Sequence, residues 1–147
     1  LSEKQIETIF KKYTKEITDK IGNRGTYTNE LNILGNHYFG NKYHGTYSSD
    51  QLPTLNTDKP YAIINVDTSK QPGSHWIAIA KYKTKYLVFD SFGRKTKTLV
   101  NSMYKKYKPT DTDYDKNQKR SEIDCGPRCI AFLRVFDEYG FEHAKLI

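Results

Sequence analysis

The chain is poor in cysteine and in apolar residues for its length of 147 residues. Its two cysteines, Cys125 and Cys129, are too few for the disulfide framework of a small secreted protein and fit a reducing compartment. No apolar run approaches the roughly 18 residues that span a membrane, and no signal-peptide pattern opens the chain, so no membrane partner is expected. Hydrophobic residues make up only 36% of the sequence, but aromatic residues, at 14%, supply much of the area for one core. We therefore expect a single domain over residues 1–147.

The net charge is strongly positive, +7, from 24 Lys and Arg residues against 17 Asp and Glu residues. Such a balance is compatible with a nucleic acid or another acidic partner. The densest basic region spans residues 105–120, and three aspartates interrupt it: Asp111, Asp113 and Asp115. A lysine-rich solvated surface explains the charge at least as well as a nucleic-acid groove, so both interpretations stay open.

Hydrophobic spacing predicts an α+β fold, a small mixed or antiparallel β-sheet covered by helices. An amphipathic helix with a capping box is expected over residues 2–21, and a short second helix runs from Thr28 until Gly35 stops it. Residues 36–59, rich in Gly, Asn, Ser and Tyr, are expected to form a surface loop. The remaining expected elements are strands at 61–66, 74–82 and 86–90, helices near 97–107 and from about 126 to 139, and an irregular segment over 110–124.

Two polar residues are expected at one end of a β-hairpin. The strands predicted at 74–82 and 86–90 are joined by a tight connection, which favours antiparallel pairing. His75 opens the first strand and Asp90 ends the second, so both should lie at the same end of the sheet. There the carboxylate can accept a hydrogen bond from the imidazole N–H and fix its tautomer. The alternative interpretation is a structural histidine and an ordinary turn aspartate.

The segment Ser121-Glu-Ile-Asp-Cys-Gly-Pro-Arg-Cys129 places a cysteine at the start of a predicted helix. An apolar run of helical spacing follows, and Pro127 suits a first helical turn, so Cys125 should face the positive end of the helix. A helix N-terminus and a basic partner can lower the pKa of a thiol from about 8.5 to roughly 3.5–7.5, which favours the nucleophilic thiolate. A buried structural cysteine is the alternative interpretation.

A polar loop supplies a fourth candidate. Gln118 lies upstream of Cys125, and its side-chain amide and the Cys125 backbone N–H could together bind a developing oxyanion. A strand histidine, a strand-end acid, a loop amide and a helix-start thiol form the set expected of a cysteine hydrolase. The spacing of Cys125 and Cys129, with no histidines clustered near them, is poor for a zinc site. Neither a metal nor an organic cofactor is therefore expected.

These motifs resemble the adenovirus maturation protease family (adenain) and its wider clan, which includes the SUMO and other ubiquitin-like-protein proteases. The resemblance covers most of the chain, residues 38–139, and keeps the order histidine, acid, glutamine, cysteine. The segments that carry it are Tyr43-His-Gly-Thr-Tyr47, Leu52-Pro-Thr, Ala62-Ile-Ile-Asn-Val66, Gly73-Ser-His75-Trp76, Phe89-Asp90-Ser-Phe-Gly93, Gln118, and Cys125 with Gly126. It implies an adenain-like α+β fold with the cysteine at the N-terminus of a central helix. Asp90 stands where adenain has glutamate, a difference that also occurs within the clan.

The resemblance implies a cysteine endopeptidase with Cys125 as the nucleophile, His75 as the base, Asp90 as the orienting acid and Gln118 as an oxyanion donor. Trp76, which would wall a narrow cleft, and Gly126 are expected to contact substrate, with simple packing as the alternative for Trp76. The implied substrates are viral capsid or core precursor proteins, cleaved beside Gly-Gly or Gly-X during virion maturation.

The resemblance also implies activation by DNA or by a viral peptide. Because no cysteine occurs outside Cys125 and Cys129, a disulfide-tethered activator is not expected. The expected location is the virion and an intracellular compartment of the host cell, for a small DNA virus such as a virophage. Two other functions stay open: an isopeptidase for SUMO- or ubiquitin-like modifiers, and a basic nucleic-acid-binding module whose Cys and His are structural.

Overall fold

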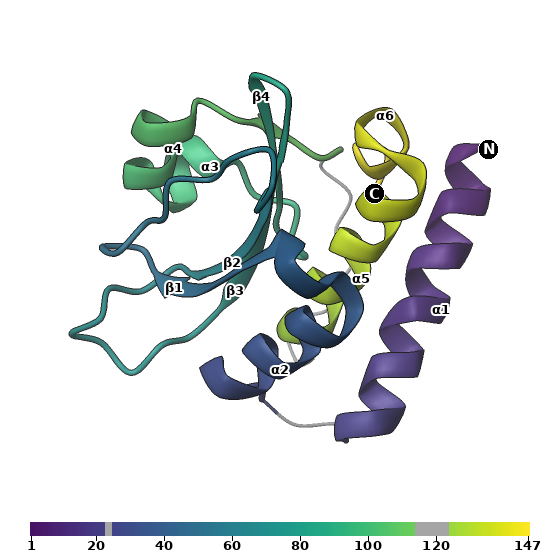
Figure 1. The fold of residues 1–147 in the computed structure, drawn as a ribbon, viewed down its shortest axis with the longest axis horizontal. Coiled ribbons are helices and arrows are strands. Elements are labelled where there is room, and N and C mark those ends of the chain that lie inside the picture. The colour runs from purple at the N-terminus through teal and green to yellow at the C-terminus, as the bar shows by residue number, and fades with distance from the viewer. Residues whose placement is uncertain (23–24, 114–123) are drawn as a thin grey trace.

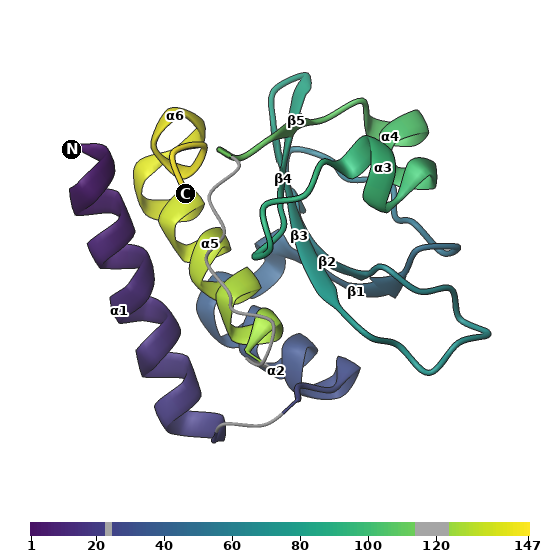
Figure 2. The same ribbon diagram turned by 180° about the vertical axis from the view of Figure 1, so that it is seen from behind.

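The computed structural model describes residues 1–22, 25–113 and 124–147, which form a mixed α+β fold (Figures 1 and 2). The helices are α1 (Glu3–Ile21), α2 (Thr28–Phe39), α3 (Thr96–Leu99), α4 (Asn101–Tyr107), α5 (Cys125–Tyr139) and α6 (Phe141–Ala144), with a 3₁₀ turn η1 (Gly40–Lys42). The strands are β1 (Tyr43–Ser48), β2 (Tyr61–Asn65), β3 (Trp76–Tyr82), β4 (Lys85–Phe89) and β5 (Thr110–Asp111). Helices α3 and α4 cover one face of the sheet, α5 lies against the other, and α1 packs outside α5.

The five strands form one mixed sheet in the order β1-β2-β3-β4-β5. The central pairs, β2–β3 and β3–β4, are antiparallel, whereas β1–β2 and β4–β5 are parallel. Along β3 the side chains alternate between two apolar clusters: Ala78 and Ala80 pack with the α1 and α5 side, and Ile77 and Ile79 with the α4 side. Apolar side chains therefore cover both faces of β3.

Helix α5 is the central helix, and its apolar residues pack on both the sheet and α1. Phe132 stacks on Phe89 of β4, with ring centroids 5.1 Å apart, and Phe10 of α1 meets Phe89 edge to face at 5.5 Å. On the outer side, the Arg134 guanidinium lies 3.7 Å from the Tyr13 ring centroid. A helix that is apolar on most of its surface is stable only when it is covered all round. The packing therefore fixes where the N-terminus of α5 lies relative to the sheet.

The expected stop at Gly35 is wrong, because α2 continues to Phe39. The ring of Tyr43 packs so closely against Gly35 that a Cβ on this residue would lie 2.3 Å from it. The glycine therefore permits a close approach between α2 and β1 and does not end the helix. The surface loop expected over residues 36–59 is also wrong in its first part, because this part contains the end of α2, η1 and β1.

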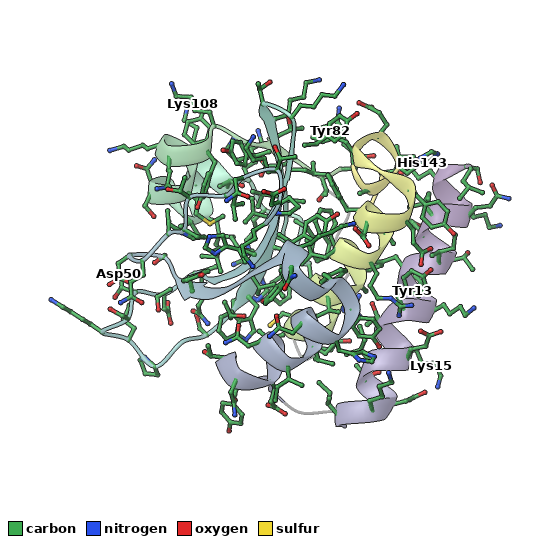
Figure 3. The ribbon with its side chains drawn as sticks, viewed as in Figure 1. Tyr13, Lys15, Asp50, Tyr82, Lys108 and His143 are labelled. Carbon is green, nitrogen blue, oxygen red and sulfur yellow. The ribbon has the colours of Figure 1, made fainter. Side chains whose placement is uncertain are left out.

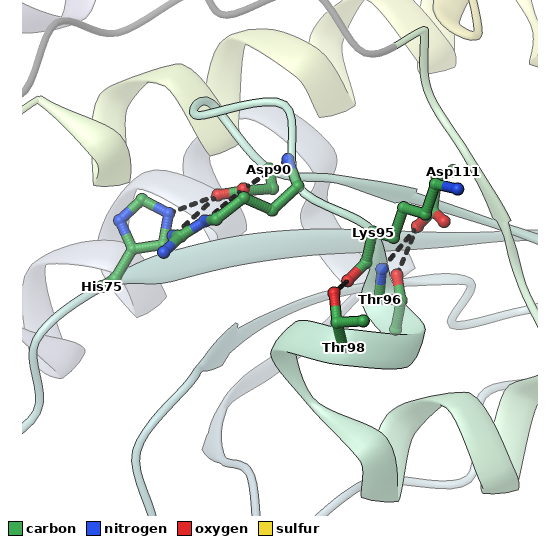
Figure 4. A network of polar contacts seen from close by, with 7 residues as sticks. His75, Asp90, Lys95, Thr96, Thr98 and Asp111 are labelled. Atoms are coloured by element: carbon green, nitrogen blue, oxygen red, sulfur yellow. Dashed lines mark hydrogen bonds and ion pairs between the residues drawn. The ribbon is translucent and has the colours of Figure 1, made fainter.

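Two further segments differ from the sequence prediction. The helix expected over 97–107 is broken at Val100 into α3 and α4, and part of the irregular segment over 110–124 is strand β5, which pairs with β4. Asp111 of β5 accepts hydrogen bonds from the backbone N–H and hydroxyl of Thr96, so the strand also holds the start of α3 (Figure 4). Among the helices in the described part of the chain, none has the length and apolar character needed to cross a membrane.

Candidate active site

The β3–β4 hairpin brings His75 and Asp90 together, as its predicted geometry requires. His75 immediately precedes β3 and Asp90 immediately follows β4. His75 Nε2 lies 2.5 Å from Asp90 Oδ1, within hydrogen-bond distance (Figure 4). The two side chains are only 8% and 2% exposed, so bulk water screens their interaction little.

The backbone before β3 is held firmly, which gives the imidazole a defined direction. The Val66 N–H donates to the His75 carbonyl at 2.9 Å, extending the pairing of β2 with β3 beyond the strand ends. Gly73 adopts a positive φ of 87°, a conformation that costs glycine little. A Cβ there would also meet the Asn65 amide nitrogen at 3.1 Å. The backbone that leads to His75 therefore requires glycine at position 73 for two independent reasons, its positive φ and the nearby Asn65 side chain.

Cys125 is the first residue of α5 and interacts with His75. Its side chain is buried, with 9% of the residue exposed, yet it lines the cleft described below. Burial lowers the pKa of the His75 imidazole, but hydrogen bonds to Asp90 and Cys125 and the charges of both partners outweigh burial, so the pKa is raised above 6.5. The imidazole therefore has two partners, a carboxylate on one side and a sulfur on the other, the arrangement in which an imidazole can take the proton of a thiol.

Asp90 is kept ionised by donors from two directions. Burial opposes its ionisation, but hydrogen bonds from His75 and Arg94 outweigh burial and lower the pKa of the carboxyl group to about 2. The Arg94 backbone N–H and Nε donate to Oδ2 at 2.9 Å and 2.8 Å, and Nη2 donates to Oδ1 at 3.3 Å. Asp90 can thus orient and charge-balance an imidazolium without taking up its proton.

A cleft of about 730 Å³ opens over this group of residues. Cys125, His75 and Arg94 line it, together with residues 25–28 at the start of α2 and residues 68, 69 and 71–74 before β3. Trp76 also lines it, and its indole N–H donates to the Thr26 carbonyl at 2.9 Å. That hydrogen bond joins the start of β3 to residues 25–28, so Trp76 and these residues form one wall of the cleft.

Gly126, the second residue expected to contact substrate, is buried and does not line the described cleft. A Cβ on it would lie 2.8 Å from the Cβ and Oγ1 of Thr26 and 3.3 Å from Leu31. The glycine thus lets residues 25–28 pack directly against the first turn of α5.

This packing makes a specific prediction. Gly126→Ala is expected to lower the free energy of unfolding by about 1–3 kcal/mol, because an added methyl group must push a short, β-branched side chain and its backbone away. Urea unfolding measures the loss. The double variant Gly126→Ala/Thr26→Gly removes the clashing atoms and should recover part of it. An unchanged stability of Gly126→Ala would show that the contact with Thr26 relaxes without cost.

Gln118 lies outside the described residues, so its role as an oxyanion donor stays a prediction. In the described part of the chain, no group of three His, Cys, Asp or Glu side chains comes together in a way that could hold a metal ion. Sequence reasoning missed Arg94 and the wall of residues 25–28. Arg94 directly follows the Phe89–Gly93 motif, but neither its spacing nor its residue type showed that the chain turns back toward Asp90.

Comparison with protein families identifies this chain's family. The model of the adenovirus endoprotease family matches residues 43–140, well over half of the chain. This span contains His75, Asp90, Gln118 and Cys125. No curated protein matches the sequence.

Proposed function

Because the chain belongs to the adenovirus endoprotease family of cysteine proteases, we propose that it is an endopeptidase that cleaves viral capsid or core precursor proteins during virion maturation, beside Gly-Gly or Gly-X. The observation that supports it most directly is the His75–Asp90 pair, at 2.5 Å, next to Cys125 in an open cleft. The substrate is a protein, as the family requires. A thiol, an imidazole and a buried carboxylate in this arrangement are the groups that attack on an acyl carbonyl requires.

In the proposed acylation step, Cys125 is the nucleophile and His75 its base. Since Nε2 is bonded to Asp90, Nδ1 is the nitrogen that takes the thiol proton. The sulfur then attacks the scissile carbonyl carbon, and the carbonyl oxygen becomes an oxyanion. The Cys125 backbone N–H, which has no intrahelical acceptor at the first position of a helix, and the Gln118 amide stabilise that charge.

Collapse of the tetrahedral intermediate breaks the C–N bond. The His75 imidazolium donates its proton to the departing amine, and a thioester on Cys125 remains. Neutral His75 then removes a proton from water, which attacks the thioester and releases the acid product. Asp90 accepts a hydrogen bond from Nε2–H in every step, so the ring keeps the orientation that both proton transfers need.

The cleft favours substrates with small residues at the scissile bond. Residues 25–28 and Trp76 are tied together by the Thr26–Trp76 hydrogen bond, and Thr26 also packs on Gly126 beside the nucleophile. Because Thr26 is hydrogen-bonded to Trp76 and also packs on Gly126, this wall cannot move aside to admit a branched side chain. Glycine in the substrate adds no side-chain volume, so it suits a cleft of this kind.

The proposal extends to partners and place of action. Activation by DNA or by a viral peptide that is not disulfide-tethered, and action in the virion and inside the host cell, accompany the family's proposed role. Lysines are spread over the molecule, and Figure 3 places Lys15 and Lys108 on opposite sides of it. A DNA effect would therefore arise from broad electrostatic attraction, and it should weaken as salt rises.

Cleavage assays test the proposed substrate class. A peptide with a Gly-Gly site is expected to be cut at that bond, and its Val-Val counterpart at least about tenfold more slowly. Mass spectrometry of the products identifies the bond. A SUMO-type reporter, assayed at the same concentration with and without DNA, is the comparison. Preferential release of the reporter would favour an isopeptidase over the proposed endopeptidase, and DNA binding without any cleavage would favour a nucleic-acid-binding module.

A further inference from the structure

Arg94 folds back onto Asp90 through the turn that ends β4. The Gly93 N–H donates to the Asp90 carbonyl at 2.9 Å, and Gly93 has a φ of 69°, in the left-handed region. This turn brings both the backbone N–H and the guanidinium of Arg94 to the carboxylate. Asp90 Oδ2 is therefore held by Arg94, which leaves Oδ1 positioned for the His75 ring.

Phe92 connects the same residues on the side of the rings. Its ring centroid lies 5.0 Å from that of His75, with 32° between the planes, and the Arg94 guanidinium carbon lies 5.0 Å from the Phe92 centroid. Each of these four residues thus contacts two of the others: His75 contacts Asp90 and Phe92, and Arg94 contacts the same two. The guanidinium stacks on one aromatic ring while its fork holds the carboxylate, a combination that lysine cannot reproduce.

We propose that Arg94 is a positioning residue of this catalytic site, which holds Asp90 in one orientation and provides it with a permanent positive charge. The inference rests on the proposed function. His75 is neutral at some stages of the reaction and charged at others, so it cannot balance the buried carboxylate throughout. A guanidinium keeps its charge at every stage. Without it, the carboxylate, only 2% exposed, would face a neutral imidazole, and the Arg94 backbone N–H is the other donor that the described residues place on it.

Among the described residues, Arg94 is the one suited to this role. The titratable and charged groups that this part of the chain places around Asp90 and its partner ring are His75 before β3, Cys125 and Cys129 on α5, and Arg94 on the turn itself. Burial raises the pKa of Cys129 well above its ordinary value, and the charges of Cys125 and Asp90 raise it further, so this thiol is neutral. Arg94 is the permanent cation among these groups. Its side chain is 44% exposed in the cleft, so its removal leaves no large cavity.

Two measurements on the full chain test the inference: kcat and KM on a Gly-Gly peptide, and the rate of Cys125 alkylation by chloroacetamide as a function of pH. Arg94→Ala is expected to lower kcat about tenfold to a hundredfold with a smaller change in KM, since a misplaced ring slows proton transfer while Trp76 and residues 25–28 still line the cleft. The acid limb of both pH profiles should move to higher pH. Loss of the cation raises the pKa of Asp90 from about 2, so the carboxylate is protonated, and lost as a partner of His75, sooner as pH falls.

Two variants separate positioning from stability. Arg94→Lys keeps the charge and loses the fork, so the acid limb should return toward that of the wild type while kcat stays reduced. Arg134→Ala removes another part-buried arginine–carboxylate pair, with Glu16 at 2.8 Å, far along α5 from the cleft. This control is expected to lower Tm without moving the acid limb.

The outcomes are distinct. A wild-type kcat and acid limb in Arg94→Ala, whatever its Tm, overturn the inference. If that variant does not fold, a wild-type kcat in Arg94→Lys overturns it. If wild-type Cys125 reacts no faster than Cys125 in His75→Ala, the proposed function itself fails, and this inference with it. A reaction that depends on His75 but ignores Arg94 contradicts the inference alone.

Discussion

Cys125→Ala is expected to lower peptide cleavage by at least about 10⁴-fold while leaving the fold intact. No other group at the N-terminus of α5 can form the acyl-enzyme, so the variant retains only the weak catalysis that binding and oxyanion stabilisation provide. The fold should survive because the residue is at the end of α5 and most of the buried side chains of this helix lie further along it. Product formation by mass spectrometry and circular dichroism together measure the two effects.

Cys129→Ala is the matched control for this prediction. Cys129 is on the same helix, one turn further along, and it is fully buried. Burial raises the pKa of its thiol well above the ordinary value, so it has no thiolate with which to replace Cys125. The variant should keep near-wild-type activity and lose about 1 kcal/mol of stability. Persistent cleavage by Cys125→Ala, or equal losses in both variants, would contradict the assignment of the nucleophile.

The fold was predictable wherever a local pattern specifies an element. Hydrophobic spacing predicted the strands that are β2, β3 and β4, and the predicted capping box opens α1, where Ser2 and Gln5 form it. The prediction failed where tertiary contacts overrule local preference. In the sequence, Gly35 is typical of a residue that ends a helix. In the structure, the ring of Tyr43, which belongs to β1, occupies the space that a side chain at this position would need. Strand β5 is too short for periodicity, and only its pairing with β4 defines it.

The site follows the same division. His75 and Asp90 were predictable because a tight hairpin determines which ends of two strands meet. Arg94 was not, because its contact with Asp90 depends on the positive φ of Gly93 and on the stacking of a guanidinium on Phe92, neither of which has a sequence signal. Hydrogen bonds in the wall of the cleft, such as that from Trp76 to Thr26, join segments far apart in the chain. Such contacts exist only once the sheet and α5 have packed.

His75→Ala is expected to lower kcat by roughly 10³-fold or more and to suppress alkylation of Cys125 at neutral pH, because the sulfur loses the base that takes its proton. The substitution should also change how stability depends on pH. The pKa of His75 is raised in the folded state, so protonated His75 stabilises the fold below the unfolded value of about 6.5, and this contribution is lost as pH rises through the folded pKa. The difference in unfolding free energy between wild type and variant should therefore be largest at acidic to neutral pH.

Urea unfolding at pH 5.5 and at pH 9, each on wild type and variant, measures that difference. The matched control is His37→Ala, which removes an exposed histidine on α2 that contacts the Tyr38 ring and lies outside the cleft. It should keep the wild-type kcat and alkylation rate. The roles of the two histidines differ because only His75 is held between a buried carboxylate and a sulfur. A His75→Ala protein that alkylates at the wild-type rate at neutral pH would mean that the helix terminus alone activates the thiol, and the imidazole would then have no part in generating the nucleophile.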